Sequence, residues 1–352
     1  MFTNSVRFDP GFDSVLQGGV DTSGVAVVAG GAGFIGSNLI WRLLGDGYQI
    51  VCLDNLETGR HENISELLTN PDFKFFLHDI IKPFHVTGRV DRIYNLACPA
   101  SPPKYQKDPV HTFLTSVVGA LNILQLADAK EARVLQSSTS EVYGDPDVTP
   151  QSEVYRGLVS TVGPRACYDE GKRAAETLFH DMHETKGVDV RISRIFNTYG
   201  PRMDPEDGRV VSNFVMQALR GEALTIYGTG GQTRSFCYID DMVNALIAHM
   251  EAEDIDFDPI NLGNPDEFTI IELAQLVRDF IPEAQGVVFH GLPKDDPKQR
   301  CPDITRAKTL LHWEPNVSLR DGLEPTIKYF RNELAQSQSF GGGQVSTTGT
   351  GG

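Results

Sequence analysis

Cysteine is scarce in this sequence, and positive charge is outnumbered. The five cysteines are scattered and form no CxxC pair, so we expect reduced thiols in a cytoplasmic protein rather than a disulfide framework or a zinc site. Acidic residues outnumber basic ones by 47 to 31, which gives a net charge of −16. Because no Lys/Arg-rich run is present, nucleic acid is not an expected partner.

Long hydrophobic runs are missing from both ends of the chain. Residues 1–24 contain acids and glycines, and they predict a loose arm rather than a signal peptide or a membrane anchor. The end "QSQSFGGGQVSTTGTGG" is rich in Gly, Ser, Thr and Gln, so we predict a disordered tail over 333–352. Between these ends, a hydrophobic content of 40% suits one large domain or two smaller ones.

A dinucleotide-binding pattern stands near the beginning, in "GVAVVAGGAGFIGSNLIWRLLGDGYQIVCLDN" (24–55). A buried strand over 25–29 is followed by Gly30, Gly33 and Gly36, and then by a helix pattern over 34–44. Glycines allow the tight turn and the close backbone approach that a pyrophosphate needs at a helix N-terminus. The next strand ends in Asp54, which is placed to bind a ribose diol and to repel a 2′-phosphate. The pattern therefore predicts NAD rather than NADP.

A phenol and an amine stand four residues apart in "CYDEGKRAAE", at Tyr168 and Lys172. On a helix these two side chains share a face. A nearby ammonium favours the phenolate, so we expect Lys172 to lower the pKa of Tyr168 and to prepare it as a general base. Alone, this short pattern is also compatible with an ordinary surface helix.

A second polar cluster lies at the end of a predicted strand in "ARVLQSSTSEVYGDP" (132–146). Together with the glycine turn and YxxxK, it resembles the extended short-chain dehydrogenase/reductase family, in its nucleotide-sugar branch. In that family a Thr or Ser, a Tyr and a Lys form the catalytic set. The resemblance implies Thr139 (or Ser138), Tyr168 and Lys172 for these roles.

Further segments resemble the members of this family that decarboxylate UDP-glucuronate to UDP-xylose. The most diagnostic are "CPASPP" and "RACYDEGKR", and the likeness extends over about residues 25–332. The segments are "NLACPASPPKYQKDPV", "STSEVYGDP", "GPRACYDEGKR", "RIFNTYGPRMDPEDGRVVSNFV", "GQTRSFCYIDD", "NLGNPDEFTI" and "DDPKQRCPDITRAK". The chain departs from the family at Ser160-Thr161, where Asn-Pro is usual. It also departs near Leu114 and Ser116, where Lys and Asn are common.

The resemblance implies the following site. The catalytic residues would be Thr139, Ser140, Glu141, Tyr168, Lys172 and Arg300. NAD would be bound by Gly30, Gly33, Phe34, Ile35, Gly36, Asp54, Asn55, Asp79, Ile80, Leu96, Ala97, Tyr168 and Lys172. The UDP-sugar, UDP-glucuronate, would be bound by Tyr105, Asn197, Arg209, Tyr227, Gln232, Arg234 and Arg300, and no metal is implied.

These residues imply a reaction with no net redox change. Tyr168 would take the proton of the sugar 4-hydroxyl, and the resulting 4-ketone would accept the electrons as CO2 leaves. We assign the later protonation at C5 to Glu141 with Ser140, which would orient a water. Two other classes stay open: a sister enzyme (UDP-glucuronate 4-epimerase or nucleotide-sugar 4,6-dehydratase), and a non-catalytic NAD-binding module.

The predicted fold is α/β, a doubly wound parallel sheet (Rossmann) with a smaller C-terminal substrate-binding domain. We assign 25–197 and 235–265 to the NAD-binding domain, and 198–234 and 266–332 to the nucleotide-sugar-binding domain. Helices near 109–129 and 167–186 carry apolar stripes, and the family implies a homodimer formed through such helices.

Overall fold

The computed structural model describes residues 23–291 and 299–341. Nearly all of the predicted N-terminal arm lies outside these residues, as does the predicted tail beyond residue 341.

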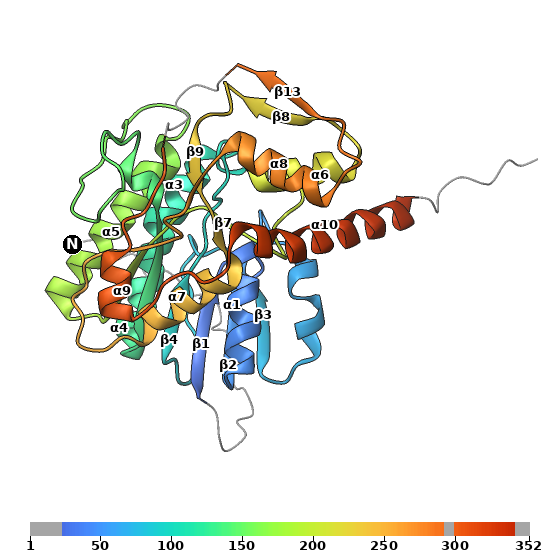
Figure 1. Ribbon diagram of the computed structural model, residues 1–352. Helices are drawn as coiled ribbons and strands as arrows, with labels where there is room; N and C mark the ends of the chain where they lie inside the picture. Colours follow the sequence, from blue (N-terminus) through green and yellow to red (C-terminus); the bar gives the residue numbers. More distant parts are fainter. Residues whose placement is uncertain (1–22, 292–298, 342–352) are drawn as a thin grey trace, which may run out of the picture.

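The central sheet is made of parallel strands whose order reverses in the middle. Its strands are β1 (Gly24–Ala29), β2 (Tyr48–Asp54), β3 (Phe73–Leu77), β4 (Arg92–Asn95), β5 (Arg133–Thr139), β6 (Val190–Ile195) and β11 (Ile260–Leu262). Within the described residues seven strands pair in the order β11-β6-β5-β4-β1-β2-β3 (Figure 1). The chain therefore builds outward from β1 in one direction and then from β4 in the other. This order confirms the doubly wound fold, whose ligand crevice lies between β1 and β4.

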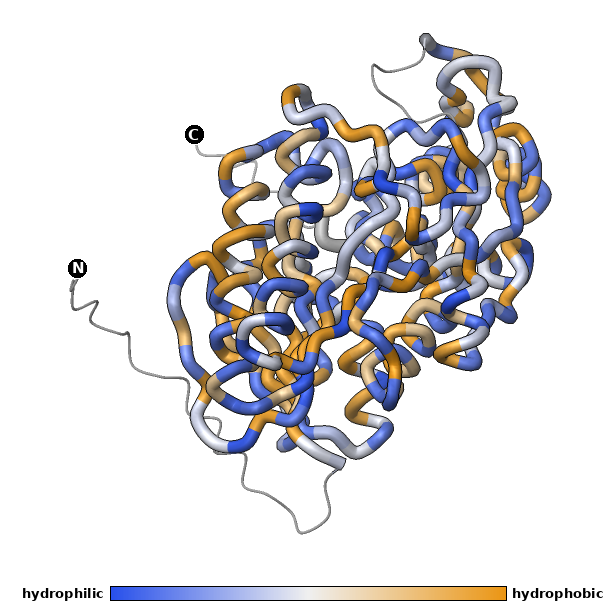
Figure 2. Tube along the Cα trace, turned by 90° about the vertical axis from the view of Figure 1, so that its left-hand side faces the viewer, coloured by the Kyte–Doolittle hydropathy of each residue, from blue (hydrophilic) through white to orange (hydrophobic). Residues whose placement is uncertain are grey.

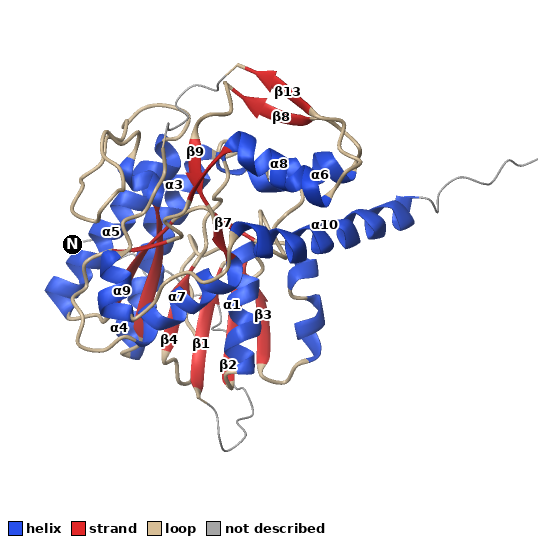
Figure 3. Cartoon of the chain, viewed as in Figure 1, coloured by secondary structure: helices blue, strands red, loops and turns tan. Residues whose placement is uncertain are grey.

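Helices cover both faces of the sheet (Figure 3). The helices nearest the sheet are α1 (Phe34–Gly45), α4 (Ala120–Lys130), α5 (Ala166–Lys186) and α7 (Ile239–Glu251). Because successive strand residues point to opposite faces, Ala26 and Val28 share a hydrophobic cluster with α1 and α7, whereas Val27 and Ala29 share one with α4 and α5. Burial on both faces explains why β1 reads as a nearly continuous apolar run.

The helix predicted over 109–129 is present but is not uniform. It consists of α3 (Pro109–Leu114), a π-helical turn η3 (Thr115–Gly119) and α4. A Cβ at Gly119 would lie 2.6 Å from a side-chain carbon of Ile80, so the glycine permits close packing here. By length and composition alone, Pro109–Lys130 could cross a membrane. Half of its most apolar window is buried inside the protein, as in a core helix of a globular fold.

The C-terminal half adds small elements above the carboxyl ends of the sheet strands (Figure 1). Helices α6 (Val210–Leu219) and α8 (Ile270–Phe280) lie beside the pair β8 (Leu224–Tyr227) and β13 (Val287–His290). Two further pairs are β7 (Thr198–Tyr199) with β10 (Cys237–Tyr238), and β9 (Thr233–Ser235) with β12 (Glu267–Thr269). The remaining elements are η1 (His61–Asn63), η2 (Ser65–Thr69), α2 (Pro102–Tyr105), η4 (Ser140–Tyr143), α9 (Thr305–Leu311) and α10 (Leu319–Gly341).

The last helix, α10, is longer than the sequence suggested. The predicted boundary at residue 332 lies inside it, because side chains on both sides of that boundary hold the helix to the fold. Phe330 is fully buried, and Glu333 forms an ion pair with Arg60, in the loop after β2. Figure 2 shows hydrophobic and hydrophilic residues alternating along the helices, as expected where one side faces the core.

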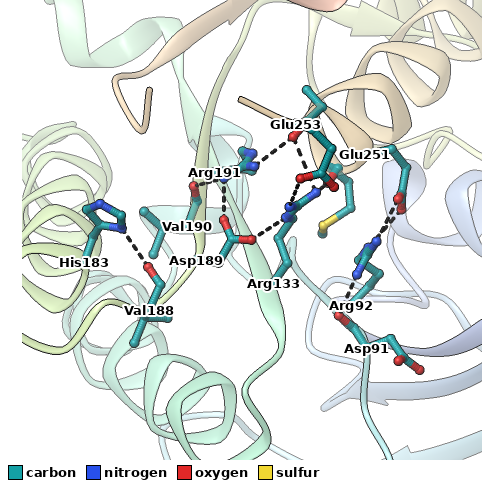
Figure 4. Close-up of polar contacts among 12 residues, drawn as sticks. Asp91, Arg92, Arg133, His183, Val188, Asp189, Val190, Arg191, Glu251 and Glu253 are labelled. Carbon is teal, nitrogen blue, oxygen red and sulfur yellow. Dashed lines mark hydrogen bonds and ion pairs between the residues drawn. The ribbon is translucent and has the colours of Figure 1, made fainter. Parts of the chain in front are cut away.

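The opposite edge of the sheet, at the amino ends of the strands, is closed by a network of ion pairs (Figure 4). Arg92 at the beginning of β4 pairs with Glu251 at the end of α7, at 2.8 Å. Arg133 at the beginning of β5 pairs with Asp189 at 2.6 Å and with Glu253 at 3.0 Å. The network therefore fixes the end of α7 against three neighbouring strands, far along the sheet from the ligand crevice.

Candidate active site

A cavity of about 640 Å³ opens at the carboxyl ends of the strands. Every residue that the sequence assigned to the site lines it. These are Gly30, Gly33, Phe34, Ile35, Gly36, Asp54, Asn55, Asp79, Ile80, Leu96, Ala97, Tyr105, Thr139, Ser140, Glu141, Tyr168, Lys172, Asn197, Arg209, Tyr227, Gln232, Arg234 and Arg300. The fold thus brings together segments from both halves of the chain.

The cofactor end is shaped by glycines. A Cβ at Gly30, whose φ is +77°, would lie 2.7 Å from the backbone nitrogen of Ala97, just after the neighbouring strand β4. A Cβ at Gly36 would lie 2.2 Å from the carbonyl oxygen of Gly30. The glycines therefore let the beginning of α1 pack tightly against the sheet. No side chain caps this helix and its first turn has no acid, so its amide groups suit a pyrophosphate.

Asp54 ties the end of β2 to the glycine turn. Its two carboxylate oxygens accept hydrogen bonds from the backbone N–H of Ala32 at 2.9 Å and of Leu56 at 2.8 Å. Burial raises the pKa of Asp54, and these two hydrogen bonds oppose the rise. The glycine turn, the uncapped helix and this acid are the donor and acceptor set that NAD requires, so the residues fit this cofactor.

A histidine that the sequence analysis did not single out lies at the same end. His111 on α3 has Nε2 at 2.8 Å from Asp79, while its Nδ1 lies 3.0 Å from Glu57 without hydrogen-bond geometry. Burial opposes a charge on His111, but Asp79 and Glu57 together raise its pKa above the usual value. Only the fold joins these three segments, so the sequence offered no signal for them.

The catalytic set predicted from YxxxK is brought together. Tyr168 and Lys172 lie in the first turns of α5, and Thr139 is the last residue of β5. A hydrogen bond joins Thr139 to Tyr168, whereas the Ser138 hydroxyl donates to Glu176 at 2.5 Å. Of the two alternatives, Thr139 is therefore the residue that contacts the phenol. The Tyr168 ring also stacks on Tyr105, with centroids 5.1 Å apart.

The expected lowering of the Tyr168 pKa is wrong. Burial raises the pKa of Tyr168 well above its usual value, and the hydrogen bond with Thr139 only partly opposes this. The Lys172 ammonium lies 5.9 Å from the ring centroid and donates to the carbonyl oxygen of Ser137 at 2.8 Å. Sequence spacing predicted the pair correctly, but it carried no information on burial.

Glu141 lies between two arginines. Its Oε2 is 3.0 Å from Nη2 of Arg300 and in short contact with Nη2 of Arg165. Burial alone would raise the pKa of Glu141, but the two guanidinium groups lower it to about 2. Arg165 stands in the diagnostic run "GPRACYDEGKR", and the sequence analysis gave it no role.

The other predicted substrate residues lie around the same end of the cavity. Arg209 is oriented by Asp207, whose Oδ2 accepts from Nε at 2.5 Å. Gln232 donates to the carbonyl oxygen of Tyr227 at 2.7 Å, and the Tyr227 side chain is 45% exposed. The half-exposed Tyr227 ring is thus available to a stacking ligand.

The departures from the family lie in two places. Ser116 is buried beside Cys98, with its Oγ 3.3 Å from the sulfur, while Leu114 is partly exposed. Ser160 and Thr161 lie in an exposed loop before α5. Within the described ranges, no group of three or more His, Cys, Asp or Glu side chains is placed to hold a metal ion.

A doubly wound sheet, a glycine turn that receives a dinucleotide, and a Thr-Tyr-Lys set beside one cavity define a nicotinamide-dependent enzyme fold acting on nucleotide sugars. The model of the NAD dependent epimerase/dehydratase family matches residues 26–263, and the chain belongs to this family. Use of NAD follows from that membership.

Several relatives at 50–53% identity are named decarboxylases. The chain is 53% identical over 322 residues to UDP-glucuronic acid decarboxylase 2 of Arabidopsis thaliana, covering 92% of this chain and 72% of that protein. It is 50% identical over 308 residues to UDP-glucuronic acid decarboxylase 1 of Danio rerio, covering 88% of this chain and 73% of that protein.

Solved structures share the fold at lower identity. One is UDP-glucuronic acid 4-epimerase from Bacillus cereus in complex with UDP-glucuronic acid and NAD. It has a TM-score of 0.76 and 28% identity, and the match covers 88% of this chain and 99% of that chain. Another is UDP-glucose 4-epimerase from Thermotoga maritima with UDP-glucose. It has a TM-score of 0.79 and 30% identity, and the match covers 88% of this chain and 99% of that chain.

Proposed function

We propose that this enzyme converts UDP-glucuronate to UDP-xylose and CO2, with NAD as cofactor and one proton consumed per turnover. The observation that carries the proposal is the pair Arg165 and Arg300 around Glu141, beside Tyr168 in one cavity. Guanidinium groups suit a sugar carboxylate because they can bind it through two parallel hydrogen bonds. The identity of 50–53% to named UDP-glucuronic acid decarboxylases supports it.

The chemistry needs a ketone next to the carbon that bears the carboxylate. When bound, NAD supplies the acceptor for the hydride of C4 and later returns it. Tyr168, hydrogen-bonded to Thr139, takes the proton of the 4-hydroxyl. The C5–C6 bond then breaks, and its electrons pass to the ketone as an enolate while CO2 leaves.

Protonation at C5 completes the loss of the carboxylate. Because Arg165 and Arg300 keep Glu141 ionised, Glu141 acts by orienting a water, together with Ser140, rather than by donating its own proton. Lys172, held by the Ser137 carbonyl, positions the phenol of Tyr168 and the nicotinamide ribose.

The test is incubation with UDP-glucuronate and NAD, following CO2 and the product sugar. Release of one CO2 per UDP-xylose is the expected result. A product that keeps the carboxylate would indicate a 4-epimerase, and no turnover at all would indicate a non-catalytic NAD-binding module. Either result would overturn the proposal.

Finer properties belong to the same proposal. Asp54 favours NAD over NADP, because its charge opposes a 2′-phosphate. The half-exposed apolar side chains Phe113, Leu114 and Leu121 on α3 and α4 support a homodimer through this face. The unpaired, scattered cysteines support a cytoplasmic location. Light scattering in solution would test the dimer.

A further inference from the structure

Arg165 lies between two carboxylates rather than one. One neighbour is Glu141, whose Oε2 it contacts closely while Arg300 holds the same oxygen at 3.0 Å. The other is Asp169, one turn further along α5, whose Oδ2 lies 3.9 Å from Nε of Arg165. Glu141, Arg165 and Arg300 line the cavity. Asp169 is not among the residues that line the cavity, so it can act on a bound sugar only through Arg165.

The carboxyl group of Asp169 has fewer and longer polar contacts than that of Glu141. Its side chain is only 9% exposed, and its Oδ1 is buried with no hydrogen-bond partner in the part of the chain that the structure describes. An ionised carboxylate in such a place would lack the hydrogen bonds that offset its lost hydration, whereas a neutral carboxyl group costs far less to bury. Burial, followed by the charge of Glu141, raises the pKa of Asp169 to about 7, against the opposing effect of Arg165 and Arg300.

The other groups around Asp169 do not reverse this balance. The charge of Asp169 acts on Cys167 and on Tyr105 of α2, and burial raises the pKa of both, so both are neutral near pH 7. Glu170, the next residue on α5, adds to the rise in the pKa of Asp169, although its Oε1 also lies 3.7 Å from Nε of Arg173. The cluster therefore holds two guanidinium charges, one ionised Glu141 and one carboxyl group that can be neutral.

We propose that Asp169 is a positioning residue that, by staying neutral, leaves Arg165 and Arg300 with a surplus of one positive charge for the carboxylate of the sugar. This rests on the proposed function and adds to it the reason for a preference for sugar acids. A sugar acid brings one negative charge, so the occupied cluster is neutral. If Asp169 were ionised, the cluster would already be neutral before the substrate arrived.

A neutral Asp169 couples binding of the sugar to proton uptake. A bound sugar carboxylate adds negative charge near Asp169 and so disfavours its ionised form. Above pH 7, binding of UDP-glucuronate therefore takes up a proton, and affinity falls as pH rises. UDP-glucose carries an uncharged hydroxymethyl group at the same carbon, so its binding should take up no proton at Asp169.

The experiment measures binding in the NAD-loaded Tyr168→Phe protein, in which turnover is stopped. Titration calorimetry at pH 8 in two buffers of different ionisation enthalpy gives the protons taken up with UDP-glucuronate and with UDP-glucose. We expect uptake of a substantial fraction of a proton with UDP-glucuronate only. Its Kd should rise on the order of fivefold to tenfold between pH 6.5 and 8.5.

Adding Asp169→Asn, a neutral side chain of the same shape, should abolish the uptake and flatten the pH dependence. The matched control, Asp181→Asn, removes an exposed charge further along the same helix and should leave both unchanged. Undiminished uptake after Asp169→Asn would place the proton elsewhere and overturn the proposal.

If the Asp169→Asn variant does not fold, proton uptake with UDP-glucuronate and with UDP-glucose in the Tyr168→Phe protein still tests the proposal. Equal proton uptake with both, or none with either, overturns the proposal. These readouts do not depend on turnover. The absence of CO2 from the wild-type reaction would overturn the proposed function instead, so the two failures are distinguishable.

Discussion

At the scale of single residues, burial controls the chemistry of this site more than sequence spacing does. Tyr168 is buried and Glu141 is largely buried, but their pKa values move in opposite directions, because only Glu141 is surrounded by guanidinium groups. Their roles in the proposed reaction should therefore be separable by substitution.

Tyr168→Phe and Glu141→Gln are expected to fail at different steps. The phenylalanine variant lacks the base for the 4-hydroxyl, so it should form no NADH in a single turnover with UDP-glucuronate. The glutamine variant should oxidise the sugar and then stall, so NADH absorbance and 4-keto sugar should accumulate. Loss of a positioned acid or base slows a step by roughly 10²–10⁴-fold, enough to be seen in stopped flow.

If neither variant forms NADH, Glu141 acts in oxidation or in substrate binding. Ser138→Ala is a matched control for Glu141→Gln. Its hydroxyl lies on the same strand end but donates to Glu176, so NADH should not accumulate in this variant.

Asp54 should decide between the two nicotinamide cofactors. Its carboxylate is fixed by Ala32 and Leu56 at the end of β2, where a 2′-phosphate would approach it. We expect NAD to bind at least about tenfold more tightly than NADP, or about 1.4 kcal/mol, in fluorescence titrations at equal salt. Asp54→Asn should narrow this ratio. Equal binding of both cofactors by the wild type would contradict the role.

At the scale of elements, α10 supports the cofactor-binding loop from outside the sheet. Tyr329 and Glu333 both contact the Arg60 guanidinium, and Arg60 lines the cavity. The C-terminal helix is therefore part of the fold up to at least Glu333.

Truncations should separate the helix from the chain beyond it. Deleting 338–352 retains Tyr329 and Glu333, so Tm and turnover should change little. Deleting 329–352 also removes the fully buried Phe330, and should lower Tm sharply, because loss of a buried phenylalanine side chain alone costs about 3–5 kcal/mol. Deleting 1–20 is expected to have little effect on either quantity. Thermal unfolding followed by circular dichroism measures all three, and a large drop for 338–352 would show that the end of the chain docks on the fold.

At the scale of the whole molecule, the ion-pair network and the active site occupy opposite edges of one sheet. Arg133 holds Asp189 and Glu253 and donates to the carbonyl oxygen of Met250 at 2.8 Å. The groups that stabilise the sheet therefore lie at the amino ends of its strands, and the groups proposed to act in the reaction lie at the carboxyl ends.

Arg133→Met should therefore lower stability and leave the site intact. We expect a loss of about 1–2 kcal/mol at pH 7, since Asp189 is 45% exposed and solvent weakens the pair. Burial would raise the pKa of Asp189, but the arginines lower it. The contribution of Asp189 to the free energy of unfolding is therefore present above its unfolded pKa, and it is lost as pH falls through the lower folded pKa. The penalty of the variant should be smaller near pH 3.5 than at pH 7 in urea unfolding. An unchanged KM for UDP-glucuronate is the control.

Much of the fold can be predicted from local features of the sequence. Glycine spacing, the apolar run of β1 and the acid at the end of β2 predict the dinucleotide fold, because each is a local requirement of backbone geometry. The pairing of Tyr168 with Lys172 is local in the same sense, since one helical turn joins them. The end of α10 was misjudged, because Gly, Ser and Gln residues hid a helix that long-range contacts hold in place.

What only the tertiary structure decided is the electrostatic state of the site. Arg165 and Asp169 lie one turn apart at the beginning of α5, but Glu141 and Arg300 come from separate segments. No spacing shows that two guanidinium groups share one carboxylate while a second carboxyl group has no hydrogen-bond partner on one oxygen within the described residues. Sequence by itself determined which residue types were present and which turns they allowed. Burial and charge balance depend on distances between segments, and those distances exist only once the chain has folded.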